Sequence, residues 1–320
     1  MAVSDEIRPV GGSAPGPDGA VRISPRVDLT NRDRTLSSSR GRWTTLRRFA
    51  RQSPIGVFAA VILISALAVA LFGPFIARVG DPQAINPLAM FAPPSADYPM
   101  GGDDLGRSVF ARLVFALRIS FALATISALL AAALGTLLGL VAGYTGGLLD
   151  EIFMRITDML FAFPTLLLAI LVATVLGPGI SGVVITIVVA TVPVFSRVAR
   201  GPTLSVRASE YAVASRVIGA SPARTLFRHV LPNVATPLLV QLAFTLSGAL
   251  VAEGALSFLG LGVQPPTPSL GSLLSNGKTY MEIAPWTMLF PGLTLAAAIL
   301  AINLLGDEFQ RFTDPRQRGR

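Results

Sequence analysis

The stretch that best indicates the architecture of this chain reads EYAVASRVIGASPARTLFRHVLPN, residues 210–233. It lies between two long apolar segments and has the pattern of two short amphipathic helices separated at Gly219. Glycine readily adopts the left-handed backbone that closes a helix. Ser221 can supply an N-cap oxygen, and Pro222 suits the first helical position, which needs no N–H. Pro232 is expected to end the second helix. A basic helix–turn–helix between two membrane spans favours docking to a soluble partner.

The composition indicates a membrane protein. Of the 320 residues, 52% are hydrophobic and only 14% are charged, whereas soluble domains carry about 25% charged residues. The apolar residues fall in blocks close to the ~20 residues that an α-helix needs to cross a bilayer. The predicted spans are 55–77, 119–144, 156–176, 180–199, 234–258 and 286–305. Backbone groups in hydrocarbon must satisfy one another, so blocks of this length predict helices rather than barrel strands. The fold class is therefore all-α, with about six transmembrane helices.

The positive charge indicates the orientation of the chain. The net charge is +8, and Lys278 is the only lysine. The arginines cluster beside span ends: Arg40, Arg42, Arg47, Arg48 and Arg51; Arg197, Arg200, Arg207, Arg216, Arg224 and Arg228; and Arg311, Arg316, Arg318 and Arg320. The positive-inside rule places these three groups, and both termini, in the cytoplasm. The loops 78–118 and 259–285 are then outside, and the distribution argues against nucleic acid as the partner.

The N-terminal region is expected to lack a fold of its own. Residues 1–50 are rich in Gly, Pro, Ser and Arg and form a predicted disordered basic cytoplasmic tail. No cleavable signal peptide is evident, so the first span is expected to act as the membrane signal. The chain has no cysteine, which excludes disulfides and thiolate metal sites.

Small residues and prolines within the spans predict how the helices pack. Ala131, Gly135, Gly139 and Gly143 recur at every fourth position and form a smooth stripe on the second span. Such stripes let another helix approach closely in lipid, and we expect packing within the chain rather than between subunits. Pro164 and Pro193 are expected to kink the third and fourth spans.

Charged residues within or beside the spans are candidates for function. Glu253 falls near the outer end of the fifth span, so it should face the bundle interior or a water-filled path. It either lines or gates a transport route or makes a structural hydrogen bond. The charges at the inner end of the third span are predicted to form an interfacial helix start with local pairs; they are Asp150, Glu151, Arg155 and Asp158. Asp307 and Glu308 are expected to be solvated at the end of the sixth span.

No motif for catalysis is found. The sequence GSLLSNGKT, residues 271–279, has five residues between its first glycine and GKT, whereas a phosphate loop needs four. Its predicted position is also outside the membrane, away from ATP. The single histidine, His229, has no partner at metal-ligand spacing and lies among arginines, which favours docking or capping over general acid–base work. We therefore expect no enzyme activity, no metal site and no cofactor; any energy source belongs to another chain.

Several stretches together carry a resemblance to a known family. They are MGGDDLGRSVFARLVFALRIS (100–120), DEIFMRITDMLFAFPTLLLAI (150–170), the 210–233 stretch, LSFLGLGVQPPTPSLGSLL (256–274) and LLGDEFQRFTDPR (304–316). In this order they resemble the inner-membrane permease subunits of ATP-binding-cassette (ABC) importers with a MetI-like core. The chain looks most like the second permease, the DppC/OppC type, of dipeptide, oligopeptide and nickel systems.

In that family the 210–233 stretch is called the EAA motif, and it forms coupling helices that sit in a groove of the ATPase subunit. Gly219, Leu231 and Pro232 fall at the spacing of the generic motif, but Val213 replaces its glutamate. The peptide branch resembles this chain instead, with a glutamate at Glu210 and a His-Val-Leu-Pro-Asn ending. The resemblance implies an ATPase-coupling loop, about 200–233, that contains Glu210, Tyr211, Ala214, Ser215, Arg216, Gly219, Ala220, Ser221, His229, Leu231, Pro232 and Asn233.

The resemblance also implies partners, domains and location. The partners are a second homologous permease of the DppB/OppB type, two ATP-binding subunits, an extracytoplasmic substrate-binding protein and the lipid bilayer. Residues 51–97 would form the first transmembrane helix and an outer loop, 98–316 the permease domain with five spans, and 317–320 a C-terminal tail. The implied location is the bacterial inner membrane, and the implied cargo is peptides.

Three alternatives stay open at this point. The cargo could be nickel or another small solute, because specificity in this family lies largely in the binding protein. An ion-coupled secondary transporter would need carboxylates near the membrane midplane, and this chain offers only the off-centre Glu253. A membrane scaffold without a transport role is the third alternative.

Overall fold

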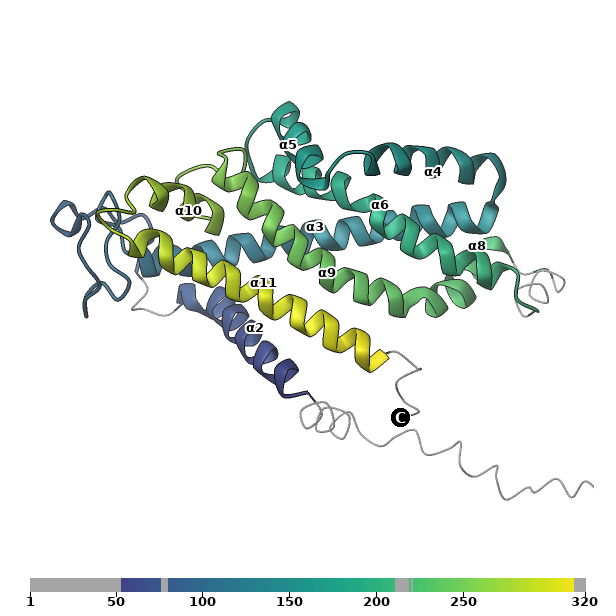
Figure 1. Ribbon diagram of the computed structural model, residues 1–320, viewed down its shortest axis with the longest axis horizontal. Coiled ribbons are helices and arrows are strands. Elements are labelled where there is room, and N and C mark those ends of the chain that lie inside the picture. Colours follow the sequence, from purple (N-terminus) through teal and green to yellow (C-terminus); the bar gives the residue numbers. More distant parts are fainter. Residues whose placement is uncertain (1–52, 76–79, 211–218, 220, 314–320) are drawn as a thin grey trace, which may run out of the picture. The chain divides into compact units, whose positions relative to one another are not determined.

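The computed structural model describes residues 53–75, 80–210, 219 and 221–313 (Figure 1). The chain divides into two compact units, Met1–Arg47 and Arg48–Arg320, and the first unit lies wholly outside these ranges. Several predictions concern residues outside the described ranges: the N-terminal tail, the arginines before the first span, the first helix of the 210–233 stretch with Tyr211, Ala214, Ser215 and Arg216, the neighbouring Ala220, and the C-terminal tail.

The described part of the second unit is mainly helical and contains no strand. The helices are α2 (Pro54–Phe72), α3 (Val109–Thr145), α4 (Gly147–Phe161), α5 (Thr165–Leu176), α6 (Ile180–Arg207), α8 (Pro222–Thr225), α9 (Leu231–Phe258), α10 (Leu270–Thr279) and α11 (Trp286–Thr313). Short turns add η2 (Gly73–Phe75), η3 (Pro87–Ala89) and η4 (Leu226–Val230). Among the described residues, 5 helices are long and apolar enough to cross a membrane, or up to 6 with the bent α4–α5 pair. The all-α polytopic prediction is confirmed.

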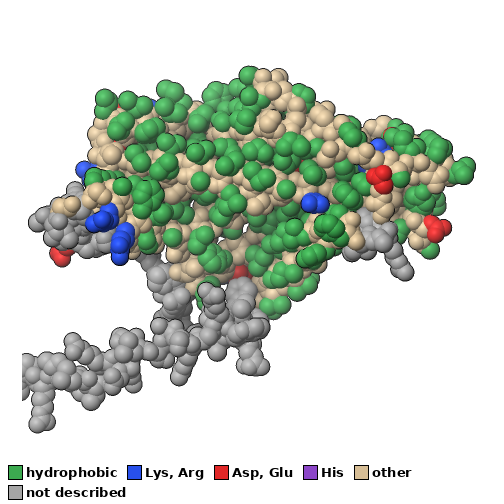
Figure 2. All heavy atoms as spheres, turned by 180° about the vertical axis from the view of Figure 1, so that it is seen from behind, with side chains coloured by type: hydrophobic (Ala, Val, Ile, Leu, Met, Phe, Trp, Pro, Cys, Tyr) green, Lys and Arg blue, Asp and Glu red, His purple; other side chains and the backbone are tan. Residues whose placement is uncertain are grey.

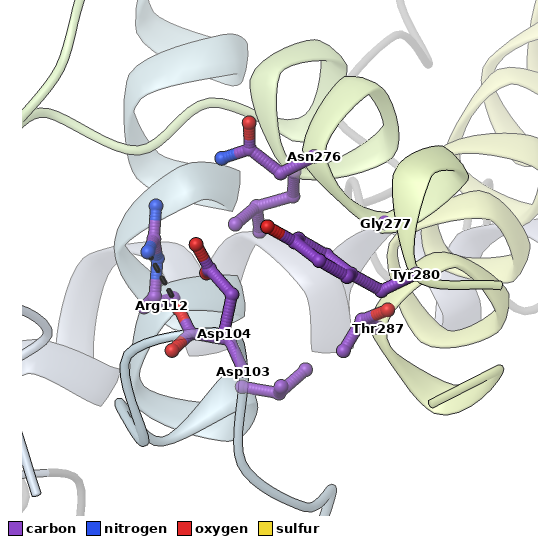
Figure 3. A pocket seen from close by; sticks show the side chains of 9 residues that line it. Asp103, Asp104, Arg112, Asn276, Gly277, Tyr280 and Thr287 are labelled. Atoms are coloured by element: carbon purple, nitrogen blue, oxygen red, sulfur yellow. Dashed lines mark hydrogen bonds and ion pairs between the residues drawn. The ribbon is translucent and has the colours of Figure 1, made fainter. Parts of the chain in front are cut away.

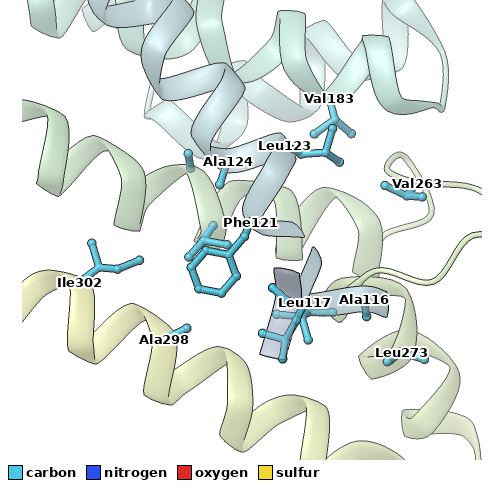
Figure 4. Close-up of a cluster of buried hydrophobic side chains, with 14 of the residues drawn as sticks. Ala116, Leu117, Phe121, Leu123, Ala124, Val183, Val263, Leu273, Ala298 and Ile302 are labelled. Atoms are coloured by element: carbon cyan, nitrogen blue, oxygen red, sulfur yellow. The ribbon is translucent and has the colours of Figure 1, made fainter. Parts of the chain in front are cut away.

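The outer surface fits a lipid environment. Figure 2 shows hydrophobic side chains spread over the visible face, with few charged ones among them. Helix α2 is typical, since Ile55, Phe58, Val61 and Ile64 are all exposed. The core lies where α3, α6, α9 and α11 meet, and Phe121, Val183, Leu250 and Ile302 are buried together there (Figure 4).

Several spans extend beyond their predicted bounds; α6, for example, continues from the predicted end at 199 to Arg207. Helix α3 begins at Val109, within the predicted outer loop, and has 37 residues. Its start is fixed by Ser108, whose side chain accepts a hydrogen bond from the Ala111 N–H at 3.3 Å. Helix α11 continues to Thr313, so Asp307 and Glu308 lie inside the helix rather than at its end. Hydropathy alone misses these turns because they contain charged residues. The helices tolerate these residues because their charges are paired, as Glu308 is with Arg311 at 2.9 Å.

The third predicted span, 156–176, is wrong as a single helix. It is divided between α4 and α5, which are bent by 95°. Pro164 stands directly before α5, as the helix cap. The kink predicted at this proline is present, as a break between two helices. Helix α4 starts before the predicted apolar span, at Gly147, close to the helix start predicted at Asp150. The glycine pair at 146 and 147 adopts positive φ values that let the chain reverse after α3. Pro193, by contrast, is buried within the continuous helix α6.

The stripe of small residues on α3 packs against α6, and this pair makes the most extensive helix–helix contact in the unit. A Cβ atom at Gly135 would lie 2.5 Å from the carbonyl oxygen of Val192, and one at Gly139 would lie 2.3 Å from that of Ser196. The α3 surface therefore touches the α6 backbone itself, which only glycine permits. The expectation that the stripe serves packing within the chain is confirmed.

The α10 end of the bundle is closed by a cap, which we define as residues 81–108 with the first turns of α3. Asp103 is its centre: its carboxylate accepts hydrogen bonds from Arg107 Nε and Arg112 Nη1, both at 2.7 Å. Arg112 is only 5% exposed, so Asp103 compensates a buried charge within α3. The Trp286 indole joins the cap to α11 by donating to the Gly102 carbonyl at 3.1 Å.

A small pocket lies beside the cap, between Asp104, Arg112, Asn276 and Tyr280 (Figure 3). Its volume is about 20 Å³, which is room for little more than one water molecule. The arrangement of charges around it is therefore a structural feature of the cap rather than a ligand cavity.

The stripe on α3 can be tested with one methyl group. We expect Gly139→Ala to destabilise the protein relative to Gly248→Ala by about 1–3 kcal/mol, because overpacking forces the backbones apart. Gly248 is a matched control, since it lies within α9 and a Cβ there would meet nothing within 4 Å. The measurement is thermal unfolding of the detergent-solubilised variants. Equal melting temperatures would show that the α3–α6 contact is not tight.

The cap can be tested through its central carboxylate. Asp103→Ala should cost about 3–5 kcal/mol of unfolding free energy, because it leaves the Arg112 charge buried without a counter-ion. The control is Asp104→Ala, which removes only a partly exposed pair with Arg107 at 3.2 Å. Chemical denaturation in detergent measures both, and a larger loss for the control would contradict the role given to Asp103.

Candidate coupling site

The turn at the centre of the 210–233 stretch forms as its sequence predicts. Gly219 has a φ of +79° and no atom crowds the space of its missing side chain, so the left-handed backbone alone requires glycine there. Ser221 caps α8, accepting a hydrogen bond from the Arg224 N–H at 3.3 Å. Pro222 is the first residue of the helix. These three predictions are confirmed.

The prediction that Pro232 ends the second helix is wrong. Helix α8 continues through a π-helical turn, η4, directly into α9, and Pro232 falls in the first turn of α9. The widened turn closes with a bond from the Leu231 N–H to the Leu226 carbonyl. A proline lacks the N–H that would bond the preceding turn, and a π-type turn is a known way to absorb such an irregularity in a helix. The membrane helix and the second half of the stretch are therefore one element.

One face of this element is fixed to the bundle. Leu226 and Val230 are buried in a cluster with Leu140 of α3, Ala199 of α6 and Val234 of α9. Burial of two large aliphatic side chains contributes about 3–6 kcal/mol in transfer terms. Residues from three long helices thus hold the short α8–η4 segment in place.

The opposite face is exposed. Arg224 and Arg228 lie one helical turn apart and point away from the bundle, and Phe227 between them is 53% exposed. Glu210, Gly219, Ser221, Pro232 and Asn233 are also exposed, whereas Leu231 is half-buried. His229 lies in η4. The described members of the predicted coupling loop therefore gather at one end of the bundle, which we call the α8 end, and present a surface with cations and one aromatic ring.

The pairing of the charged side chains on α4 was only partly predicted. A local pair exists between Glu151 and Arg155, at 4.0 Å. The other two carboxylates reach across to α6: Asp150 binds Arg200 through two hydrogen bonds of 2.6 and 2.7 Å, and Asp158 contacts Arg197 at 2.5 Å. The expectation of local pairs is thus wrong for Asp150 and Asp158. The sequence shows complementary charges on two helices, but it has no signal for which helix faces which.

Glu253 is completely buried in α9. Its Oε1 accepts a hydrogen bond from Ser257 Oγ at 2.8 Å, and that hydroxyl accepts one from the Val263 N–H at 3.2 Å. Ser120 of α3 lies beside the same carboxyl and accepts from the Leu270 N–H at 3.1 Å. The carboxyl is thus the centre of a polar group that joins α3, α9 and the start of α10. The interior position agrees with the prediction, and the structural hydrogen bond is present; a role in a transport path stays a prediction.

The stretch 271–279 that resembles a phosphate loop is helix α10. Its start has a reciprocal cap in which the Ser269 and Ser272 side chains each bond the other's backbone. A phosphate loop would present backbone N–H groups before a helix, whereas here Gly271 lies inside the helix against the Gly254 carbonyl. The geometry offers no cradle for phosphate.

The comparisons with known proteins agree with this geometry. Residues 135–319 match the family model described as "Binding-protein-dependent transport system inner membrane component". The chain is 34% identical to the dipeptide transport system permease protein DppC of Alkalihalophilus pseudofirmus, over 86% of this chain and 90% of that one. It is 40% identical to a probable peptide ABC transporter permease protein of Sinorhizobium fredii, over 90% and 98%. A glutathione transport system permease protein, GsiD, of Escherichia coli is also 40% identical, over 85% and 90%.

The fold has a counterpart among solved structures. A chain of the methionine ABC transporter MetNI, in an inward-facing conformation, superimposes with a TM-score of 0.50 at 19% identity. The match covers 63% of this chain and 96% of that chain, so it supports the MetI-like fold alone. The family matches do not favour the alternatives of a secondary transporter or a scaffold. The chain belongs to the family of binding-protein-dependent transport system inner-membrane components, and it is a permease subunit of an ABC importer.

Proposed function

We propose that this chain forms, with a second homologous permease, a transmembrane path for small peptides. A substrate-binding protein delivers the peptide at the α10 end, and two ATP-binding subunits drive transport from the α8 end. The names of the relatives support the cargo: they transport dipeptides, peptides or glutathione, which is itself a short peptide. The permease does no catalysis of its own, and ATP hydrolysis belongs to the partner subunits.

The observation that carries the coupling role is the two-sided character of the α8–η4 segment. Leu226 and Val230 fix it to the bundle, while Arg224, Phe227 and Arg228 face outward. An exposed aromatic ring flanked by arginines suits a partner groove with apolar and acidic groups, because these are the side chains that carry binding energy at interfaces. A partner that grips the outer face would move α9 with it, since the two form one helix.

The same arrangement gives the mechanism. ATP binding can shift the balance between inward-open and outward-open states only as far as it interacts differently with the two. Closure of the ATP-binding subunits changes the position of the grooves, and a segment seated in each groove passes that displacement to the spans. We infer that the α8 end is cytoplasmic, because Arg197, Arg200, Arg207, Arg224 and Arg228 gather there. Both termini are then cytoplasmic as well, and the membrane is the bacterial inner membrane.

We propose that Glu253 supports the transport path through structural hydrogen bonds. Its carboxyl is enclosed and bonded to Ser257, next to the loop between α9 and α10. It therefore holds the outer end of α9 rather than meeting the solute there.

The coupling role predicts a specific defect at Gly219. Gly219→Pro cannot keep a φ of +79°, since the proline ring fixes φ near −65°. Uptake and co-purification of the ATP-binding subunits should both fall at least about tenfold, the effect of a free-energy change of about 1.4 kcal/mol, and membrane insertion should stay normal. The matched control is Gly80→Pro, another left-handed, uncrowded glycine, in the segment before the cap. Normal uptake by the Gly219 variant would sink the coupling assignment; deletion of 214–219 provides a second test.

The cargo is tested with the complete importer in proteoliposomes. The binding protein, both permeases and the ATP-binding subunits are reconstituted, and ATP-dependent uptake of a labelled dipeptide is measured. Unlabelled dipeptide and glutathione should compete, whereas a nickel chelate should not. Titration calorimetry of the binding protein with the same solutes gives an independent ranking. Nickel uptake without peptide competition would overturn the peptide proposal and leave the permease assignment intact.

A further inference from the structure

Helix α4 turns its apolar face outward and two of its acidic residues toward the bundle. Its apolar side chains face outward, and those exposed are Leu148, Leu149, Ile152, Ile156 and Met159. Its carboxylates Asp150 and Asp158 face α6 instead, and Figure 1 shows α4 lying alongside that helix. The contact between α4 and α6 therefore depends on charge, where most helix pairs in this bundle depend on apolar or glycine contacts.

The two ion pairs differ in strength. Asp150 and Arg200 make a bidentate pair whose side chains are only 14% and 31% exposed, and such paired geometry gives both strength and direction. Asp158 and Arg197 are about half exposed, but the Arg197 guanidinium also lies 3.9 Å from the centre of the Phe161 ring. Phe161 is the last residue of α4, so the second contact holds the helix close to its bend.

The segment of α6 that receives these contacts is fixed on its other side by α3. A Cβ atom at Gly139 would lie 2.3 Å from the Ser196 carbonyl, and one at Gly143 would lie 3.1 Å from the Arg200 carbonyl. The same residue, Arg200, thus touches α3 through its backbone and α4 through its side chain. Helix α6 ends at Arg207, within the predicted coupling loop and three residues before Glu210, where the 210–233 stretch begins.

We propose that the pairs Asp150–Arg200 and Asp158–Arg197 form a clasp, by which the bent α4–α5 segment follows α6 when the coupling loop moves. The four residues are positioning residues for transport, not contacts of the solute. The proposal rests on the coupling role proposed above. Helix α4 is the N-terminal arm of the break at Pro164, so the position that the clasp gives it also sets where α5 begins.

The clasp has a clear functional consequence. Without it, ATP hydrolysis would continue in an assembled complex, but the α4–α5 segment would no longer follow each cycle. The quantity to measure is therefore the amount of peptide taken up per ATP hydrolysed. Coupling between distant sites usually amounts to about 5–150-fold, and we expect loss of the clasp to lower this ratio by about tenfold.

The experiment exchanges charges in the full importer, reconstituted with its binding protein. Asp150→Arg and Arg200→Asp should each lower uptake per ATP, and the double exchange should restore most of it. The matched control is the pair Glu151 and Arg155 on the same helix, which is 65% and 73% exposed with a distance of 4.0 Å. Its single exchanges, Glu151→Arg and Arg155→Glu, should leave the ratio unchanged.

The outcomes separate this proposal from the one on which it rests. If the importers with single exchanges in the clasp take up as much peptide per ATP hydrolysed as the wild type, the proposal of the clasp is wrong and the coupling role stands. If the wild-type permease does not bind the ATP-binding subunits, the coupling role itself fails. Should the single exchanges prevent assembly, Asp158→Asn decides, since this half-exposed site tolerates an isosteric change. An unchanged ratio in that variant, or an assembled double exchange that stays uncoupled, would overturn the clasp.

Discussion

The approach of α3 to the α6 backbone is the contact on which the rest of the unit depends. In lipid no hydrophobic force draws apolar helices together, so association relies on close van der Waals contact over a smooth surface. Gly135 and Gly139 provide that surface, since a Cβ atom on either would lie 2.5 Å or less from a main-chain carbonyl oxygen of α6. This contact fixes the register of the two helices. It thereby sets Leu140 and Ala199 side by side, where they receive Leu226 of the coupling segment.

Charges inside the bundle follow a second constraint, since each costs free energy unless it has a partner. Arg112 meets Asp103, Arg200 meets Asp150, and Glu253 meets Ser257. Asp103 and Asp150 lie outside the helices that carry Arg112 and Arg200, whereas Ser257 lies one turn after Glu253 on the same helix. These pairs allow helices to run past the limits that hydropathy suggests. They also place these pairs toward the two ends of the bundle.

The features that the sequence predicted correctly are those with local causes. The left-handed turn at Gly219, the cap at Ser221 and the break at Pro164 depend on backbone chemistry within a few residues. The packing stripe on α3 was equally predictable, because residues four positions apart lie on one face of a helix. What could not be predicted depends on long-range pairing. The partners of Asp150 and Asp158 lie 50 and 39 residues away in the chain.

The error at Pro232 shows how the coupling segment joins the membrane domain. A proline that ended the helix would have placed a flexible joint between α8 and α9, and motion of the segment would have been lost in that joint. The π-turn at 226–230 keeps the helix continuous instead. Helix α9 has 28 residues, so it is about 42 Å long at 1.5 Å per residue. It runs from the buried contacts of Val234 at the α8 end to the Glu253–Ser257 pair at the α10 end. Helix α9 contains Pro237, a residue at which helices kink, but no loop interrupts it. A displacement at its first turn is therefore passed along the helix rather than lost in a joint.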